Sequence, residues 1–464
     1  MYSLPSMIRG SRSFGWSKIA LAVQLAGAAG CAVQPAVDET VAASSAALAL
    51  NSVTRESFDN QGRQGNGESI APHISGNQQF FVFQSNATVW ASAVDTNGES
   101  DIYLKDRNTG FITLVSAANG VVGNAGSLNP SVSDSGKVAF VSNATNLAPD
   151  ASAPGAKILL SSGGTISRVD IALSGQANGP ATRPQISGDG NWVAFQSNAT
   201  NLVAGDTNGA TDIYVRNLSS NQVIRASVTQ SNTEPNGACI EPSISYDGRF
   251  VAFTCFASNM LFNDFNGVAD VFVRDLVMGT TQPASFSTTG QGGAVGNGQS
   301  DTAQISGDGR HVVFRSFSTN WDPTDTNGLA DIYLRDLGTI GTPFRMSISS
   351  AGVQANQGSF QSAISFAGGA VAFVSNATTL VSGDTNGAAD VFVRSRTTGQ
   401  TLRVQRDPAT QPNGSAVVNS TLRFSGTPTN PVFSFLAFDS FATNLTFSND
   451  TNNVADVFSA SLSP

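Results

Sequence analysis

The chain has 464 residues, enough for two or three ordinary domains or for one large repeat domain. Hydrophobic residues make up 40% of it, charged residues only 12%, and 46 residues are Gly, which favours short strands and turns over helices. A net charge of −9 and the absence of any Lys/Arg cluster exclude a nucleic-acid binder, so cations, basic partners or neutral glycans fit the balance better.

The N-terminus has the pattern of an export signal. Basic residues precede an apolar run, Ile19–Ala29, which is too short to span a bilayer in the usual way. Small residues then lead to Cys31, as in a bacterial lipobox, where the thiol is lipidated and becomes the mature N-terminus. The alternative is ordinary cleavage after Ala28, which leaves Cys31 free. We predict a signal peptide over residues 1–30, then a flexible tether over 31–50.

One unit recurs along the rest of the chain at roughly 60-residue spacing, which is the signature of a repeat architecture. Its clearest copy, Pro184–Asn217, is PQISGDGNWVAFQSNATNLVAGDTNGATDIYVRN. Further copies begin at Pro72, Pro130, Pro242, Gln304 and Ile364, and a drifted last copy begins near Ser420. The sequence therefore predicts seven units.

Each unit is expected to form four strands. In the clearest copy these are 184–187, then 192–197 after an Asp-Gly turn, then 212–217, and finally 223–228. The second and third strands are apolar on both faces, which suits a sheet enclosed between two neighbouring sheets. Four-stranded sheets repeated around an axis form a β-propeller. We therefore predict an all-β, seven-bladed β-propeller of four-stranded antiparallel blades over residues 51–464.

The two ends of the repeat region predict how the ring closes. The last copy stops after its third strand, whereas Asn51–Ser69 matches the fourth strand and following loop of the other units. The N-terminal strand should therefore complete the last blade, so that no sheet edge is left free.

The pattern S-x-D-G-x-x-V-A-F-x-S followed by D-I-Y-V-R-D resembles the WD40-like repeats of TolB-type propellers of the bacterial envelope. The resemblance covers about residues 51–464 and implies the fold together with an envelope location: an outer-membrane lipoprotein, or a periplasmic or cell-surface protein. This chain has seven units where TolB has six, and a longer loop between the second and third strands. For that reason no TolB partner role is carried over.

The long loop carries the most regular chemistry, the motif Asp-x-Asn-Gly-x-x-Asp. Two carboxylates and an amide oxygen are hard ligands of the kind that Ca²⁺ prefers. The alternative is a plain turn, because Asp and Asn cap turns and Gly supplies positive φ. The candidate ligands are Asp95, Asn97, Asp101, Asp206, Asn208, Asp212, Asp264, Asn266, Asp270, Asp325, Asn327, Asp331, Asp384, Asn386, Asp390, Asp450, Asn452 and Asp456.

Calcium is thus a candidate cofactor for stiffening these loops, although the set of ligands is incomplete compared with an EF-hand loop. The second unit loses all three groups together, since Ala151, Ala153 and Lys157 stand in their places. This joint loss indicates that the three groups act as one network, whether or not a metal sits in it.

Two cysteines lie in one unit and are absent from the others. Cys239 and Cys255 flank a hairpin turn nearly opposite each other, so they form either a cross-strand disulfide in an oxidising compartment or two buried thiols.

No catalytic constellation stands out. His73 and His311 occupy variable positions of the repeat, and we expect them to be packing or surface residues. We therefore predict a non-catalytic, monomeric binding or scaffold protein of the envelope, attached to the membrane by a lipid anchor. Its ligand, a protein or a glycan, is expected on the face that carries the long loops. The alternative is a glycan-cleaving hydrolase with a carboxylate pair at the channel mouth.

Overall fold

The computed structural model describes residues 47–90, 97–149, 155–172, 175–261, 266–287, 294–339, 341–416, 422–431, 435–448 and 450–463, which all belong to one compact unit, Ser44–Pro464. These residues form strands and turns, and none of them lies in a helix. Within the same ranges, no helical segment has the length and apolarity that a membrane span requires. The predicted signal peptide, Cys31 and residues 31–46 of the predicted tether lie outside the described residues.

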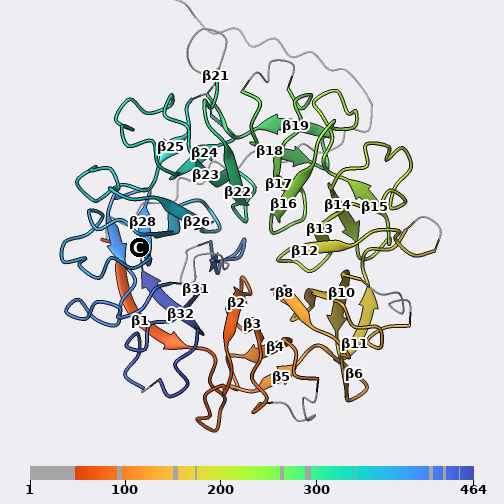
Figure 1. Ribbon diagram of the computed structural model, residues 1–464, viewed down its shortest axis with the longest axis horizontal. Coiled ribbons are helices and arrows are strands. Elements are labelled where there is room, and N and C mark those ends of the chain that lie inside the picture. The colour runs from red at the N-terminus through yellow and green to blue at the C-terminus, as the bar shows by residue number, and fades with distance from the viewer. Residues whose placement is uncertain are drawn as a thin grey trace, which may run out of the picture. The chain divides into compact units, whose positions relative to one another are not determined.

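Seven four-stranded antiparallel sheets stand around a common axis, as Figure 1 shows. Blade 1 is β2 (Ser69–Ile74), β3 (Phe80–Ser85), β4 (Asp101–Asp106) and β5 (Ile112–Leu114). Blade 2 is β8 (Ser127–Val132), β9 (Val138–Ser142), β10 (Lys157–Ser162) and β11 (Thr165–Arg168). Blade 3 is β12 (Ala181–Ile186), β13 (Trp192–Ser197), β14 (Asp212–Asn217) and β15 (Val223–Arg225). Blade 4 is β16 (Cys239–Ile244), β17 (Phe250–Cys255), β18 (Asp270–Asp275) and β19 (Thr280–Pro283).

Blade 5 is β22 (Ser300–Ile305), β23 (His311–Ser316), β24 (Asp331–Asp336) and β25 (Phe344–Arg345). Blade 6 is β26 (Ser359–Ile364), β27 (Ala370–Ser375), β28 (Asp390–Ser395) and β29 (Thr401–Arg403). Blade 7 is β30 (Arg423–Phe424), β31 (Phe435–Ser440), β32 (Asp456–Ser463) and β1 (Ala49–Arg55). Two short hairpins, β6–β7 (Ala117–Ala118, Val121–Val122) and β20–β21 (Phe286–Ser287, Ala294–Val295), lie in the loops that join blades.

The predicted seven-bladed propeller is confirmed, and the chain closes the ring as expected. β1 pairs antiparallel with β32, so the N-terminal strand is the outermost strand of blade 7. Glu56 follows β1 and fixes the junction, because its carboxylate accepts from Ser459 of blade 7 and pairs with Lys105 (3.0 Å) and Arg107 (2.9 Å) of blade 1. These two cations lower the pKa of Glu56 although burial opposes them.

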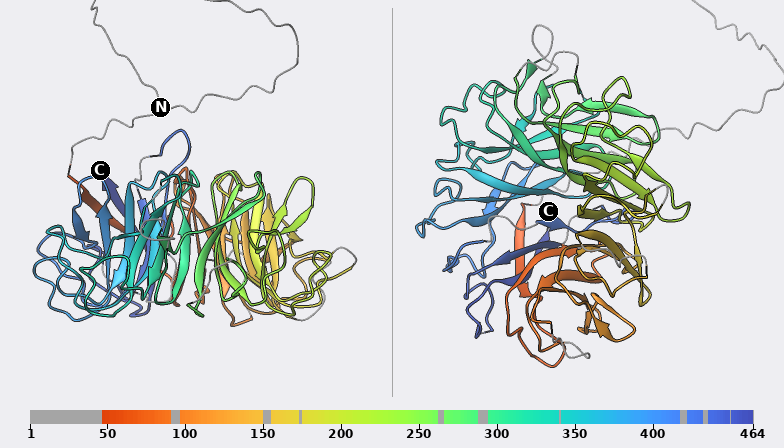
Figure 2. Two further views of the ribbon diagram at one scale, coloured as in Figure 1. Left: turned by 90° about the horizontal axis from the view of Figure 1, so that it is seen from above. Right: turned by 45° about the vertical axis from the view of Figure 1, so that its right-hand side comes forward.

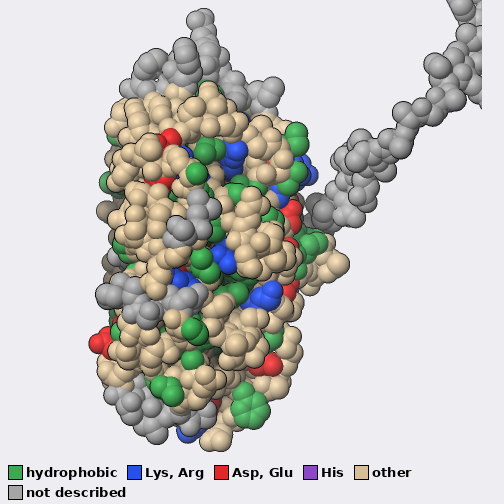
Figure 3. Space-filling view, turned by 90° about the vertical axis from the view of Figure 1, so that its right-hand side faces the viewer, with side chains coloured by type: hydrophobic (Ala, Val, Ile, Leu, Met, Phe, Trp, Pro, Cys, Tyr) green, Lys and Arg blue, Asp and Glu red, His purple; other side chains and the backbone are tan. Residues whose placement is uncertain are grey.

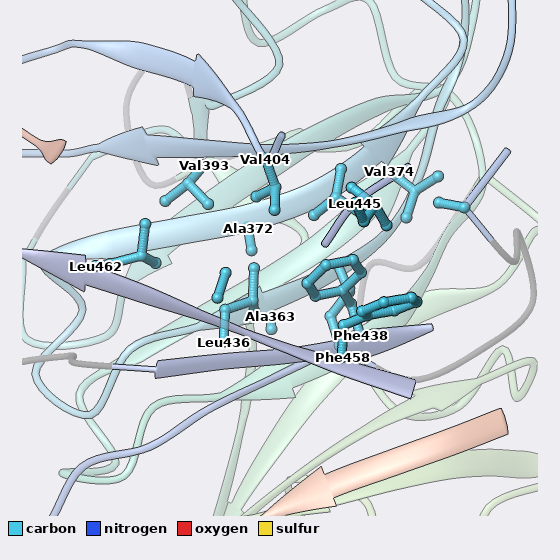
Figure 4. Close-up of a cluster of buried hydrophobic side chains, with 14 of the residues drawn as sticks. Ala363, Ala372, Val374, Val393, Val404, Leu436, Phe438, Leu445, Phe458 and Leu462 are labelled. Atoms are coloured by element: carbon cyan, nitrogen blue, oxygen red, sulfur yellow. The ribbon is translucent and has the colours of Figure 1, made fainter. Parts of the chain in front are cut away.

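Apolar side chains fill the spaces between blades. Ala372 of β27 shares one buried cluster with Leu436 and Phe438 of β31, between blades 6 and 7 (Figure 4). The second and third strands are buried along nearly their whole length, which is why their sequences are apolar on both faces. Within blade 3, Phe195 and Tyr214 stack with ring centroids 5.9 Å apart.

The two faces of the ring differ, as the edge-on view in Figure 2 shows. The connections between second and third strands, and those between blades, lie on one face, here called the long-loop face. Hairpin turns occupy the opposite face, here called the turn face, where a typical connection runs only from Ile186 to Trp192. Blade 7 is an exception, because its β30–β31 connection extends from Phe424 to Phe435. On the side of the ring shown in Figure 3, basic and acidic side chains are interspersed rather than gathered in a field of one sign.

Candidate functional site

The asparagine of the Asp-x-Asn-Gly-x-x-Asp motif holds the long loops in shape. In blade 3, the Oδ1 atom of Asn208 accepts from the backbone N–H of Ala210 (2.8 Å), while its Nδ2 atom donates to the carbonyl of Pro235 (3.0 Å) in the neighbouring loop. The same pair of bonds recurs at Asn97, Asn266, Asn327, Asn386 and Asn452. The amide oxygen is therefore already engaged by its own turn, as the structural alternative predicts.

In blade 3 the two aspartates of the motif and Glu234 come together in one cluster. Their carboxylate oxygens lie within 4.8 Å of one another, a spacing that suits a metal ion. However, Nη1 of Arg225 lies 3.9 Å from Asp206, 3.4 Å from Asp212 and 2.6 Å from Glu234. A guanidinium thus supplies the positive charge that a cation would bring.

The pKa values of this cluster follow from burial and from its hydrogen bonds. Burial raises the pKa of Asp212, because a carboxylate that loses water favours its neutral form. Glu234 is more exposed, and although burial opposes the effect, hydrogen bonds from Thr207 and Arg225 lower its pKa to about 2. Glu234 is therefore ionised at neutral pH, where it pairs with the guanidinium.

An arginine stands at the position of Arg225 on the fourth strand in four more blades. It lies opposite the aromatic residue of the third strand in blades 5, 6 and 7, and opposite Leu159 in blade 2. Arg345 pairs with Asp322 (3.1 Å), Asp325 (3.6 Å) and Asp331 (3.5 Å) in blade 5. Arg403 and Arg55 pair with the motif aspartates of blades 6 and 7, namely Asp384 (3.2 Å), Asp390 (3.3 Å) and Asp456 (3.4 Å).

Blades 1 and 4 lack this arginine. Leu114 and Pro283 occupy the equivalent register positions, opposite Tyr103 and Phe272. The closing aspartates of these blades, Asp101 and Asp270, each accept a hydrogen bond from a buried serine of the following loop. The first aspartates of the motif in these two blades, Asp95 and Asp264, lie outside the described residues. Asp450, the first aspartate of blade 7, accepts from the Nε2 atom of Gln64 (2.9 Å).

Blade 2 exchanges the charges instead of losing them. Lys157 stands at the position of the closing aspartate, and Asp170 stands where four other blades and the ring-closing segment place a serine. Asp170 accepts from the N–H of Ile158 (2.9 Å) and pairs with Arg168 (2.8 Å). The closing carboxylate that is lost at Lys157 is thus replaced by a buried carboxylate across the same pair of strands, while Ala151 and Ala153 lie outside the described residues.

The central channel contains two cavities whose lining residues differ from blade to blade. A cavity of about 270 Å³ opens at the long-loop face and is lined in part by Arg183, Glu241, Arg315 and Arg423. A second cavity, of about 110 Å³, lies toward the turn face, and Arg423 lines both. Gln185 and Gln304 also line both cavities, so these three residues lie between them.

Five residues in left-handed conformation form part of the wall of the long-loop cavity. Ala71, Asn129, Arg183, Glu241 and Thr302 have φ between 51° and 58° and occupy the same position in the innermost strands of blades 1 to 5. Each lies within a register shift between the first and second strands of its blade, so it does not follow the ladder. Such conformations are strained outside Gly and are often found at functional sites.

Two aromatic rings narrow the channel at the turn face. Tyr246 reaches from blade 4 to hydrogen-bond the carboxylate of Asp134 in blade 2 (2.7 Å) and contacts Phe366 of blade 6 edge-on, with centroids 5.6 Å apart. The equivalent residues of neighbouring blades are glycines. A Cβ atom at Gly188 or Gly307 would lie 2.2 Å from these rings, so Gly is required there to make room.

Three phenylalanines on the long-loop face are exposed. Phe256, Phe317 and Phe441 each follow the second strand of their blade and are 50%, 42% and 47% exposed. Arg315, which lines the cavity, lies 5.7 Å from the ring centroid of Phe317. Phe317 therefore places an aromatic ring beside one cation of the mouth.

The cysteines and histidines fall in separate places. Cys239 and Cys255 stand directly opposite each other in β16 and β17 and form a disulfide. His73 lines the turn-face cavity, where burial and the nearby Arg423 lower its pKa well below the usual value. His311 is buried at the start of β23, beside Arg396 and 3.6 Å from Asp336.

The chain matches no protein-family model and no curated protein. Solved structures similar to it include TolB from Acinetobacter baumannii, at 17% identity and a TM-score of 0.38, over 73% of this chain and 63% of that one. They also include the β-propeller domain of the Trilobed protease from Pyrococcus furiosus (10%, 0.48; 85% of this chain, 95% of that one). A third is an oligogalacturonate lyase in complex with manganese (12%, 0.49; 90% and 96%). This chain spans less than two thirds of the TolB structure's length, and no activity is inferred from proteins at this similarity.

Proposed function

We propose that the chain is an exported, non-catalytic binding protein of the cell envelope that takes its ligand at the long-loop mouth of the channel. The supporting observation is the cavity of about 270 Å³ there, which is lined by charged residues that the repeat does not dictate. Seven equivalent blades would give a uniform wall, so residues such as Arg183 and Arg423 point to a specific ligand rather than to the needs of the fold.

The mouth suits a ligand that carries both polar groups and an apolar face, as a glycan or a peptide segment does. Charged and amide side chains inside the cavity supply hydrogen bonds, and the exposed ring of Phe317, which lies beside Arg315 of the cavity wall, supplies apolar contact. We favour a glycan or protein ligand over a metal, because in blades 3, 5, 6 and 7 a guanidinium already neutralises the loop carboxylates.

The test compares the soluble ring with a Phe317→Ala variant on glycan and peptide arrays. Phe317 is partly exposed and its loss leaves no cavity in the core, so the variant should fold normally. We expect at least one ligand class to bind the parent chain and to bind the variant more weakly. A Phe111→Ala variant serves as the matched control, because Phe111 is 60% exposed but lies next to β5, away from the channel. Equal loss in both variants, or no binding to either array, would refute the proposal.

A second candidate function is glycan hydrolysis by a pair of carboxylates at the mouth. Glu241 and Asp301 favour it because both contact Thr302, through its backbone N–H (3.1 Å) and its hydroxyl (3.4 Å). Against it, each carboxylate pairs with an arginine, Glu241 with Arg183 (3.4 Å) and Asp301 with Arg315 (2.7 Å). An activity screen on acidic and neutral glycans decides: turnover by the parent chain that Glu241→Gln abolishes would establish the hydrolase.

Export and lipidation are part of the same proposal. They are supported by the sequence pattern that ends at Cys31. Mass spectrometry of the protein recovered from membranes tests them, because a lipidated Cys31 adds the mass of its acyl chains and a Cys31→Ser variant should be released in soluble form. A mature N-terminus at Ala29 without added mass would show ordinary cleavage after Ala28 instead.

A further inference from the structure

Arg423 carries a positive charge inside the channel that no carboxylate of the described residues balances. Its guanidinium donates to the amide oxygens of Gln304 and Gln185, the latter at 2.7 Å, and to the carbonyl of its neighbour Leu422 (3.1 Å). All three acceptors are neutral. Since a guanidinium has five N–H groups, the Nε–H and one Nη2–H of Arg423 have no protein acceptor in this part of the structure.

The remaining charges of the long-loop cavity cancel within the protein. Arg183 pairs with Glu241 (3.4 Å), and Arg315 forms a bidentate pair with Asp301 (2.7 Å for both contacts). Because the charge of Arg423 is not balanced, the long-loop cavity carries a net charge of +1. Burying an uncompensated charge is unfavourable, and burial lowers the pKa of Arg423 to about 10, so it is still charged at neutral pH.

Hydrogen-bond donors surround this charge. Gln185 and Gln304 turn their oxygens to Arg423, which leaves their Nε2 groups to donate elsewhere. Ser362 lines the same cavity, is 4% exposed, and its hydroxyl has no hydrogen-bond partner among the described residues. A site rich in donors, with one unbalanced cation, is complementary to an anion.

We infer that Arg423 anchors the carboxylate group of the ligand that the proposed function places at the long-loop mouth. A carboxylate matches the site in charge, because one negative charge balances one cation, whereas a doubly ionised phosphate would leave one charge over. It also matches in shape, since its two coplanar oxygens fit the edge of a guanidinium. The carboxylate belongs either to an acidic sugar or to the C-terminal end of a peptide. Both enter from the long-loop face, because Tyr246 and Phe366 narrow the other end.

The test uses acid and amide forms of two small probes on the soluble ring. D-glucuronate is compared with D-glucuronamide, and acetyl-glycylglycine with its C-terminal amide, by calorimetry and thermal shift at millimolar concentration. We expect one acid of the two to bind and both amides to fail, and the acid that binds tells the sugar source from the peptide source. Arg423→Gln should lower the affinity for that acid by about tenfold or more, because the loss of a hydrogen bond to a charged group has an effect of this size. Arg423→Lys should keep part of the affinity.

A matched control separates this site from general loss of positive charge. Arg310→Gln removes the same charge from an exposed turn on the opposite face and should leave binding unchanged. The ligand-free proteins give a second readout. Arg423→Gln should melt at a higher temperature than the parent chain, because it removes an unbalanced buried charge, whereas a purely structural arginine would give the opposite result.

The inference fails if acids and amides bind equally, if no acid binds, or if Arg423→Gln binds the acid as the parent chain does. It also fails if Arg423→Gln melts below the parent chain. In each case the proposed function stands as long as Phe317→Ala still weakens a ligand found on the arrays. The inference and the proposed function both fail if, in addition, no ligand on the arrays depends on Phe317.

Discussion

Replacing Arg225 with leucine, the residue that blade 1 has at this position, should destabilise blade 3 and make it respond to calcium. In the parent chain, Nη1 of Arg225 balances the carboxylates of Asp206, Asp212 and Glu234. The substitution leaves these groups close together without a cation. Their mutual repulsion should then oppose folding unless a divalent cation takes the place of the guanidinium.

The expected loss of stability in Arg225→Leu follows from the burial of the cluster. Removing one partner from a buried ion pair costs about 3–5 kcal/mol, and the 20% exposure of the Glu234 side chain places this case near the lower end. Unfolding entropy of about 2.1 cal/mol/K per residue gives roughly 0.8 kcal/mol/K for about 400 residues, so a loss of about 3 kcal/mol lowers the Tm by about 4 °C. Calcium at about 100 times its Kd would stabilise the folded variant by about 2.7 kcal/mol, which restores most of the lost stability.

Calorimetric melting of the parent chain and of Arg225→Leu, each with EDTA, magnesium or calcium, measures both effects. Arg249→Leu is the matched control, because Arg249 pairs with Asp275 (2.7 Å) at the surface, where we expect a change below about 1 kcal/mol and no response to calcium. If Arg225→Leu melts like the parent chain, the guanidinium does not stabilise the loop. If the variant is destabilised but calcium restores nothing, the cluster cannot hold a cation. A calcium response of the parent chain would instead support calcium in the loops.

Three further predictions concern closure, covalent linkage and pH. Glu56→Gln should lower the free energy of unfolding by about 2–3 kcal/mol at neutral pH, because it removes two buried ion pairs at the junction of the ring. The pKa of Glu56 is lowered in the folded state, so the difference between variant and parent chain in urea unfolding should shrink as the pH falls through that pKa. The double variant Cys239→Ala/Cys255→Ala should lose about 3 kcal/mol under oxidising conditions, the value for closing a loop of this length, and equal melting of both proteins would contradict it. Burial raises the pKa of Asp331 to about 6, so between about pH 4 and pH 6 the folded chain holds a proton there that the unfolded chain releases. The stability of the parent chain relative to Asp331→Asn should therefore be greatest below about pH 4 and fall by up to roughly 3 kcal/mol as the pH rises through 6. A difference that does not change with pH would refute the shift.

Local patterns were sufficient to predict the repeat architecture. The second and third strands of the clearest copy were expected at 192–197 and 212–217, and the structure places β13 and β14 at those bounds. These strands are short, apolar on both faces and bounded by turn residues, so their sequence carries the information directly. The fourth strand, expected over 223–228, ends at Arg225 because the chain then leaves the sheet to reach the next blade.

The candidate site could be predicted only in part. The long loops and their shared face followed from strand alternation, whereas the network of three motif groups stays a prediction, because Ala151 and Ala153 of blade 2 lie outside the described residues. The arginine that balances the loop carboxylates was missed, although its recurrence on the fourth strand at Arg225, Arg345 and Arg403 was a usable signal. Another missed signal was the residue after the serine of S-x-D-G, where glycine alternates with Asp134, Tyr246 and Phe366.

By itself the sequence determined the number of blades, their strands and the N-terminal closure, because each depends on a pattern that repeats within one unit. Only the tertiary structure decided which residues meet across the channel. Arg423 comes from blade 7 and its partners Gln185 and Gln304 come from blades 3 and 5; all three occupy the same repeat position, two residues before the serine of S-x-D-G, but the pattern within a unit does not show that their side chains meet. Their contact arises because closing the ring brings the innermost strands of all blades around one axis, where departures from the repeat meet.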